Sequence, residues 1–96
     1  MIKHIVMFKL ANQNEETQEA LVSALNGMAG KIDVLKHLEV GVDFKKGPNS
    51  YDVILTTHFE NKDGLQAYSS HPVHQPVLQL VNTLCSGRTV VDYETP

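Results

Sequence analysis

Apolar and polar residues alternate along four stretches of the chain, and this alternation predicts four β-strands. The stretches cover residues 2–10, 38–44, 51–59 and 88–94. In the first stretch, Ile2, Val6 and Phe8 fall on one face, while Ile5 and Met7 fall on the other. Residues 51–59 are likewise apolar on both faces. Strands of this kind are typical of a sheet that is covered on two sides.

Apolar residues spaced three and four apart predict a helix between the first two strands. Asn14 is a favourable N-cap for a helix that starts at Glu15. The core-facing positions of this helix are Leu21, Ala24, Leu25 and Met28. Gly27 and Gly30 end it.

The stretch between the last two strands predicts a helix in two pieces. Asn61 caps a short first piece that runs through Tyr68, and Pro72 ends this piece or opens the next. The core-facing residues of the second piece are Val77, Leu78, Val81, Leu84 and Cys85. We expect Ser86-Gly87 to stop this helix before the last strand begins at Arg88.

The predicted order of elements is β-α-β-β-α-β, which is the ferredoxin-like α+β arrangement of a four-stranded antiparallel sheet with helices on one face. The uncovered face then carries either Ile5, Met7, Ile54 and Val90 or, in the reverse assignment, Val6, Phe8, Val53 and Val91. In both cases apolar sheet surface needs a partner. We therefore expect a homodimer in which two sheets meet face to face and close an α/β barrel.

Composition and charge exclude several classes of protein. The chain has 96 residues, which predict a single domain over residues 1–96, and a net charge of −3 that argues against a nucleic-acid partner. The apolar run near the N-terminus is broken by Lys3, His4 and Lys9, so we expect no membrane anchor. Cys85 is the only cysteine and has no disulfide partner within the chain, which indicates a reducing, cytoplasmic location.

Five segments of the chain together resemble a known family. They are IKHIVMFKL, KIDVLKHLEVG, YDVILTTHFEN, LQAYSSHPVHQPV and RTVVDYE, in this order along nearly the whole sequence. With its K-H before an apolar strand and its Y-x-x-H-P-x-H box, the chain resembles the stress-responsive A/B barrel (Dabb) family. The resemblance implies a dimeric α+β barrel, in agreement with the two-faced strands.

The resemblance also implies a site. A plant polyketide cyclase of this family runs an intramolecular aldol condensation without metal or cofactor, and uses the tyrosine and the second histidine of the box. These two residues match Tyr68 and His74, and a histidine of its first strand that lines the same pocket matches His4. An aldol reaction needs a base to remove a proton beside a carbonyl, which suits His74, and a hydrogen-bond donor for the enolate oxygen, which suits Tyr68.

The substrate of that relative is not expected to carry over. Its first helix brings bulky aromatic residues to the pocket, whereas the matching stretch here offers Ala20, Leu21 and Ala24. We therefore expect a pocket for a small, largely apolar molecule, with no cofactor. Its ligand-binding residues are predicted to be His4, Val6, Phe8 and His71.

Each candidate residue also has a structural interpretation. His74 could be a histidine at the edge of the core, hydrogen-bonded to a backbone carbonyl or to His4, and Tyr68 could be an aromatic residue that covers the core. His71 precedes Pro72 and suits a junction. A metal site at His71 and His74 is not expected, because Pro72 interrupts the helix that would align them and no carboxylate or thiol is nearby. Pro76 could start the helix and leave His74 in a turn.

Two other functions stay open at this point. A non-enzymatic stress-related protein, whose assembly is its function, would have a filled interior. A haem- or quinol-handling monooxygenase would need a cavity large enough for a ring system beside His4 or His74. His58 alternates with Ile54 and Thr56, which predicts a place at the dimer interface or on the surface.

Overall fold

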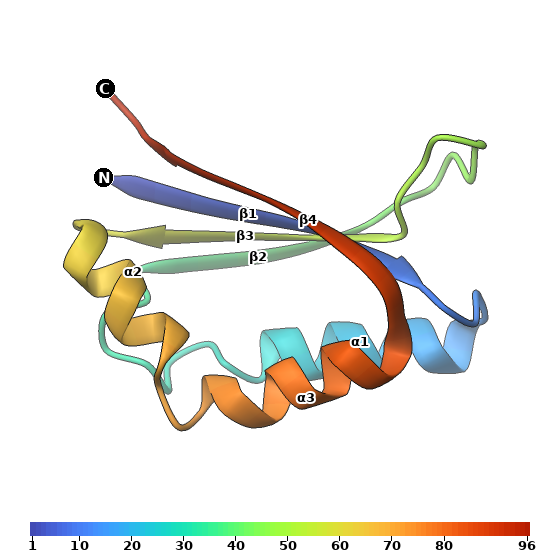
Figure 1. Cartoon of the computed structure of the whole chain (residues 1–96), viewed down its shortest axis with the longest axis horizontal. Helices are drawn as coiled ribbons and strands as arrows, with labels where there is room; N and C mark the ends of the chain where they lie inside the picture. Colours follow the sequence, from blue (N-terminus) through green and yellow to red (C-terminus); the bar gives the residue numbers. More distant parts are fainter.

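The four alternating stretches form one antiparallel sheet in the computed structural model, which describes residues 1–96 (Figure 1). The strands are β1 (Ile2–Leu10), β2 (His37–Val42), β3 (Val53–Phe59) and β4 (Cys85–Glu94). Their order across the sheet is β2-β3-β1-β4, so the first and last strands of the chain lie side by side. The predicted ferredoxin-like α+β fold is confirmed.

The structure has three helices: α1 (Glu15–Asn26), α2 (Lys62–Ser69) and α3 (His74–Leu84), and the first two begin after predicted caps. The side chain of Asn14 accepts a hydrogen bond from the N–H of Thr17 at 2.8 Å. Asn61 accepts one from the N–H of Gly64 at 2.9 Å. Both N-caps therefore lie where the sequence predicts them. None of the three helices combines the length and the apolar content that crossing a bilayer requires.

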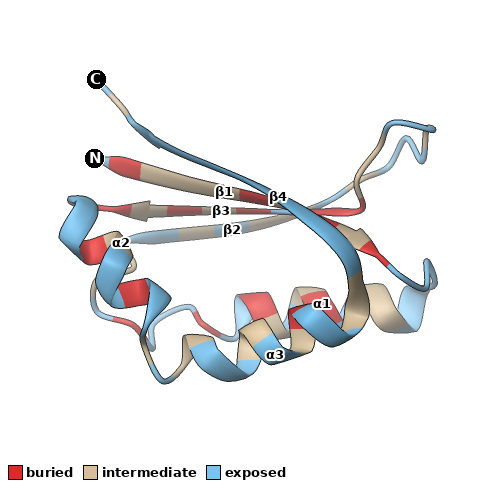
Figure 2. Cartoon of the chain, viewed as in Figure 1, coloured by how far each residue is buried: buried red, intermediate tan, exposed pale blue.

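The hydrophobic core lies between the helices and one face of the sheet (Figures 1 and 2). Its residues come from alternate positions of β1 and β3 and from the helices and the loop after α1: Ile2, Val6, Phe8, Leu10, Leu21, Leu25, Met28, Ile32, Val53, Leu55, Phe59, Tyr68 and Val81. Because strand side chains alternate, His4 points to this same helix-covered face. The fold thus places the histidine of the first strand beneath the helices.

The other face of the sheet, called the open face below, has no helix over it (Figure 1). The strand register gives its residues as Lys3, Ile5 and Met7 of β1, His37, Glu39 and Gly41 of β2, Ile54, Thr56 and His58 of β3, and Thr89, Val91 and Tyr93 of β4. Val91 and Tyr93 are 54% and 43% exposed. A contiguous apolar surface of this kind indicates an interaction site.

The register of β4 corrects the predicted membership of the two faces. Val90 pairs with Val6 and lies on the helix-covered side, so Val91 accompanies Ile5 on the open face. Each of the two alternative sets was therefore wrong at one or more positions. The register shifts between Lys9 and Leu10, which pair with Gly87 and Cys85, so that Ser86 is the extra residue of a β-bulge.

Three predicted boundaries were also wrong. Helix α3 ends at Leu84 and β4 begins at Cys85, so Ser86-Gly87 belongs to the strand rather than stopping the helix. Strand β2 ends at Val42, because the side chain of Asp43 accepts the N–H of Lys46 at 2.7 Å and starts a turn. Strand β3 begins at Val53 rather than two residues earlier.

Candidate functional site

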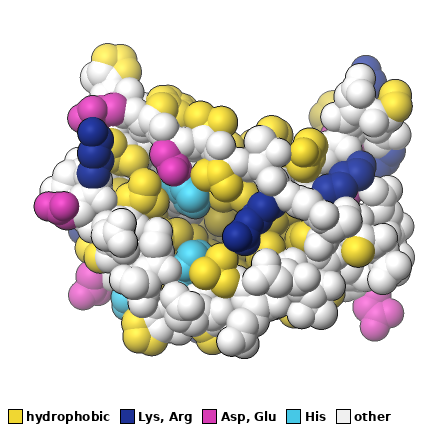
Figure 3. Space-filling model, viewed as in Figure 1, with side chains coloured by type: hydrophobic (Ala, Val, Ile, Leu, Met, Phe, Trp, Pro, Cys, Tyr) yellow, Lys and Arg dark blue, Asp and Glu magenta, His cyan; other side chains and the backbone are white.

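A cavity of about 140 Å³ lies between the helix-covered face of the sheet and helices α2 and α3. Its lining residues are His4, Val6, Phe8, Leu25, Met28, Leu55, Tyr68, Ser69, His74, Val77, Leu78, Val81, Arg88 and Val90. Figure 3 shows it as a hollow walled by apolar side chains, with histidines inside and a basic group across it. An engineered cavity of about 150 Å³ in another protein binds benzene, so this volume suits a group of about one six-membered ring.

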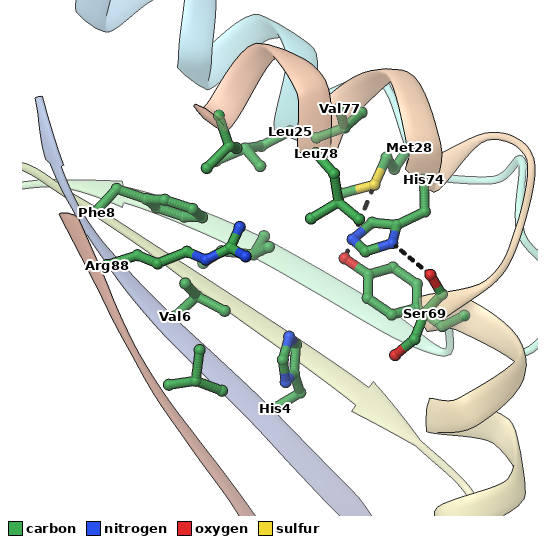
Figure 4. Close-up of a pocket in the computed structure, with 14 residues that line it drawn as sticks. His4, Val6, Phe8, Leu25, Met28, Ser69, His74, Val77, Leu78 and Arg88 are labelled. Atoms are coloured by element: carbon green, nitrogen blue, oxygen red, sulfur yellow. Dashed lines mark hydrogen bonds between the residues drawn. The ribbon is translucent and has the colours of Figure 1, made fainter. Parts of the chain in front are cut away.

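Tyr68 stands between the two histidines of the cavity. Its ring centroid lies 4.3 Å from that of His74 and 5.9 Å from that of His4. The tyrosine is only 1% exposed, and it packs on Phe59 with ring centroids 5.0 Å apart. Its hydroxyl donates to the sulfur of Met28 at 3.8 Å, a weak acceptor (Figure 4). The hydroxyl therefore has only this weak acceptor as a hydrogen-bond partner within the chain.

His74 is the first residue of α3, and Pro76 does not displace it. Pro76 is the third residue of the helix, where its missing N–H is one of the four that have no partner within a helix. The carbonyl four residues earlier belongs to Pro72, which lies outside the helix, so the usual clash of an interior proline is avoided. The side chain of His74 thereby stays at the cavity wall.

The tautomer of His74 follows from its partner. Its Nδ1 lies 3.1 Å from the backbone oxygen of Ser69 (Figure 4). A carbonyl oxygen only accepts, so Nδ1 carries the proton and donates it, which leaves Nε2 with a free lone pair in the neutral ring. His74 therefore bonds to a backbone carbonyl and also lines the pocket, so the two interpretations of this residue hold together.

Burial sets the protonation of the two rings. Desolvation lowers the pKa of His74 below its ordinary value of 6.5, against the opposing hydrogen bond to Ser69, and the charges of His4, Arg88 and His71 lower it further. Desolvation raises the pKa of Tyr68 to about 12. At neutral pH, His74 is therefore a neutral proton acceptor and Tyr68 a protonated donor. Side by side, they are a base and a hydrogen-bond donor.

Two residues of the site were missed from the sequence. Asp92 of β4 pairs directly with His4 of β1, and its carboxylate bonds to Nδ1 of that histidine. Arg88, on the same face of β4, extends its guanidinium into the cavity (Figure 4). Alternation along residues 88–94 places Arg88, Val90 and Asp92 on one face of the strand. Which way this face points depends on the pairing of β4 with β1, which is distant in the sequence.

The remaining predicted residues separate into two groups. Val6 and Phe8 line the cavity together with His4. His71 is not among the lining residues. Its Nδ1 accepts the N–H of Val73 at 3.0 Å and its carbonyl accepts the N–H of His74 at 2.9 Å, so its ring and backbone shape the junction between α2 and α3. The prediction that His71 contributes to this pocket therefore does not match its position.

Two further histidines lie away from the cavity. His58 lies on the open face, with its ring centroid 4.5 Å from that of His37. No group of three or more His, Cys, Asp or Glu side chains is arranged to hold a metal ion.

Comparison with known proteins gives a family match over almost the whole chain. The sequence profile of the "Stress Responsive A/B Barrel Domain" (Dabb) matches residues 2–95. An uncharacterized protein of Streptomyces coelicolor is 30% identical over 97 residues, which cover 98% of this chain and 99% of that protein.

Solved structures share the fold as well. A dimeric protein of unknown function with a ferredoxin-like fold from Bacteroides fragilis is 29% identical, with a TM-score of 0.84 over 98% of this chain and 95% of its own. A dimeric ferredoxin-like protein of unknown function from Thermobifida fusca is 25% identical, with a TM-score of 0.87 over 98% of this chain and 90% of its own. Both of these relatives are described as dimers.

Proposed function

The chain belongs to the stress-responsive A/B barrel family, and on that premise we propose that it is a homodimer that binds a small, largely apolar molecule and performs acid–base chemistry on it. One observation carries the proposal. The neutral ring of His74 and the protonated hydroxyl of Tyr68 lie side by side at the wall of an apolar cavity. The proposed domain spans residues 1–96. A cytoplasmic location stays a prediction from the single cysteine.

The reaction we propose begins with removal of a proton from a carbon beside a carbonyl group. Nε2 of His74 takes the proton, and the electron pair of the broken C–H bond moves to the carbonyl oxygen as an enolate. Tyr68 donates a hydrogen bond to that oxygen. In an aldol step the enolate carbon then attacks a second carbonyl, a C–C bond forms, and the resulting alkoxide takes the proton back from His74.

His4 and Asp92 support this chemistry. The hydrogen bond that Nδ1 of His4 donates to the carboxylate of Asp92 orients the imidazole, so that its Nε2 is on the side of the ring away from Asp92. A carboxylate that holds a histidine in this way fixes both the tautomer and the direction of the ring. We propose that His4 positions the ligand against Tyr68, whose ring it meets edge-on.

The homodimer is proposed to form through the open face. Helices cover the other face, and Val91, Tyr93 and Ile54 leave exposed apolar area here. A chain of this length buries only roughly 65% of its unfolded surface by itself, so shared burial with a second copy stabilises it. The dimeric relatives named above have the same fold.

The size of the cavity bears on the two other functions. A purely structural role predicts a filled interior, so a cavity of about 140 Å³ favours ligand binding. The same volume is too small for the four pyrrole rings of a haem. It would admit the single ring of a quinol, but no further feature favours that ligand.

Titration with cyclohexanone, a ketone of one six-membered ring, tests the ligand site. We expect NMR shifts confined to the lining residues. The Val77→Phe variant fills the cavity from a half-buried position and should abolish these shifts, whereas Leu80→Phe, on the same helix but not at the cavity, should leave them intact. Absence of shifts in the wild-type protein, or equal shifts in both variants, would contradict the proposed site.

A further inference from the structure

We infer that Arg88 makes the cavity selective for a small apolar carboxylate rather than a neutral molecule. The inference rests on the proposed function, because it assumes that the cavity binds a small apolar ligand. It goes further by assigning the chemical class of that ligand and the residue that recognises it.

The guanidinium of Arg88 stands at the cavity without a salt-bridge or hydrogen-bond partner. It pairs with Phe8 across β1 and β4, on the helix-covered face, and its guanidinium points into the cavity past the ring of Phe8 (Figure 4). The only side-chain contact within ion-pair distance joins His4 to Asp92. Asp92 lies four residues from Arg88 along the same strand, which is about 13 Å at the usual rise, and no side-chain hydrogen bond engages the guanidinium.

Arg88 is also the only permanent charge among the lining residues. Ten of the 14 lining residues are hydrophobic, Tyr68 among them. Besides Arg88, the other three are Ser69, which carries no charge, His4 and His74. His74 is held neutral by burial, which lowers its pKa, and the positive charge of Arg88 lowers that pKa further.

The cost of removing water explains the selectivity. A neutral apolar molecule that fills the cavity strips water from one side of the guanidinium and offers nothing in return. A carboxylate replaces that water with two parallel charge-assisted hydrogen bonds, because its two oxygens match the planar fork of arginine. The apolar remainder of the ligand then lies against the hydrophobic wall. Combined with the proposed reaction, this assigns the substrate class as an apolar acid that also carries a carbonyl group.

Two probes of equal shape isolate the charge: benzoate and benzamide. Titrations are made at low ionic strength, because salt screens an exposed cation. We expect the wild-type protein to bind benzoate about tenfold more tightly than benzamide, the lower range for a hydrogen bond to a charged group. Arg88→Gln should remove this preference. Arg88→Lys, which keeps the charge but not the fork, should retain part of it.

A matched variant separates Arg88 from the general charge of the protein. Lys45→Gln removes one positive charge from an exposed loop outside the cavity lining and should keep the full preference. Equal affinities for both probes in the wild-type protein, or a preference that survives Arg88→Gln, would overturn the inference while leaving the proposed ligand site intact. Binding of neither probe would overturn the ligand site and the inference together.

Discussion

The rings of Tyr68 and His74 pack against each other with their centroids 4.3 Å apart and their planes tilted by 36°. The contact joins the last turn of α2 to the first turn of α3 across the junction that His71 and Pro72 form. It brings the protonated hydroxyl of Tyr68 next to a neutral imidazole whose Nε2 carries no proton. The junction thus has a structural role, and the residues on either side of it carry the proposed chemistry.

Replacement of Tyr68 by phenylalanine separates packing from chemistry. The ring and its burial remain, and the lost hydroxyl bonds only to sulfur, so we expect the free energy of unfolding to fall by about 1 kcal/mol or less. The rate of proton abstraction should fall by about 10²- to 10³-fold, as for loss of one donor to an enolate oxygen. Urea unfolding and kinetics check the two expectations. A rate unchanged in Tyr68→Phe would remove the tyrosine from the mechanism.

The pH dependence follows from the directions of the two pKa shifts. The pKa of His74 is lowered by burial, so the base is neutral and active above that lowered value and loses activity as the pH falls through it, below 6.5. Burial raises the pKa of Tyr68 to about 12, so the donor persists through the alkaline range. A rate profile with an acid limb below 6.5 is expected. An acid limb above 6.5 would contradict His74 as the base.

The same shift of the His74 pKa affects the stability of the fold. The pKa of His74 is 6.5 in the unfolded chain and lower in the folded chain. At a pH between the two pKa values, the unfolded state therefore holds more protons. The contribution of His74 is therefore complete above 6.5 and is lost as the pH falls through the folded pKa. NMR titration of the imidazole gives that folded value.

Asp92 is expected to act as a positioning residue through His4. Asp92→Asn should lower the rate by less than the roughly 10²- to 10⁴-fold that a catalytic acid or base contributes, with little change in unfolding. Nitrogen chemical shifts of the His4 ring provide a readout that a merely structural role would not move, because the amide changes which tautomer is favoured. Unaltered ring shifts in Asp92→Asn would show that the carboxylate does not set the tautomer.

The open face is tested by a charge on one of its two inner strands. Ile54→Glu puts a carboxylate into the proposed apolar interface and should convert the dimer to a monomer in light scattering after gel filtration. Ala20→Glu, at an exposed position of α1, makes the same change of charge away from the sheet and should remain dimeric. A wild-type protein that is monomeric at low concentration would contradict the proposed interface.

The fold was largely predictable because local patterns determine it. The alternation of β1 gave its observed bounds, and Asn14 and Asn61 marked two helix starts. The register of β4 was not predictable, because the bulge at Ser86 depends on how this strand meets Leu10. The face of Val90 and Val91 was therefore open to two interpretations.

The site was predictable only in part. The resemblance pointed to Tyr68, His74 and His4, and these three meet at one cavity. Arg88 and Asp92 act there only through the pairing of the first and last strands, in which Asp92 and its partner His4 lie 88 positions apart in the chain. Local sequence patterns predicted the fold but not the register of that pairing, which decides the residues that face each other.

The central proposal for this protein is that His74 acts as a base beside Tyr68. The most direct measurement is the exchange of the α-hydrogens of cyclohexanone for deuterium, followed by NMR in heavy water at neutral pH. We expect the protein to accelerate this exchange, and we expect His74→Gln, which cannot take up the proton, to abolish the acceleration while the protein stays folded. Exchange at the wild-type rate in His74→Gln would contradict the role of His74 as the base.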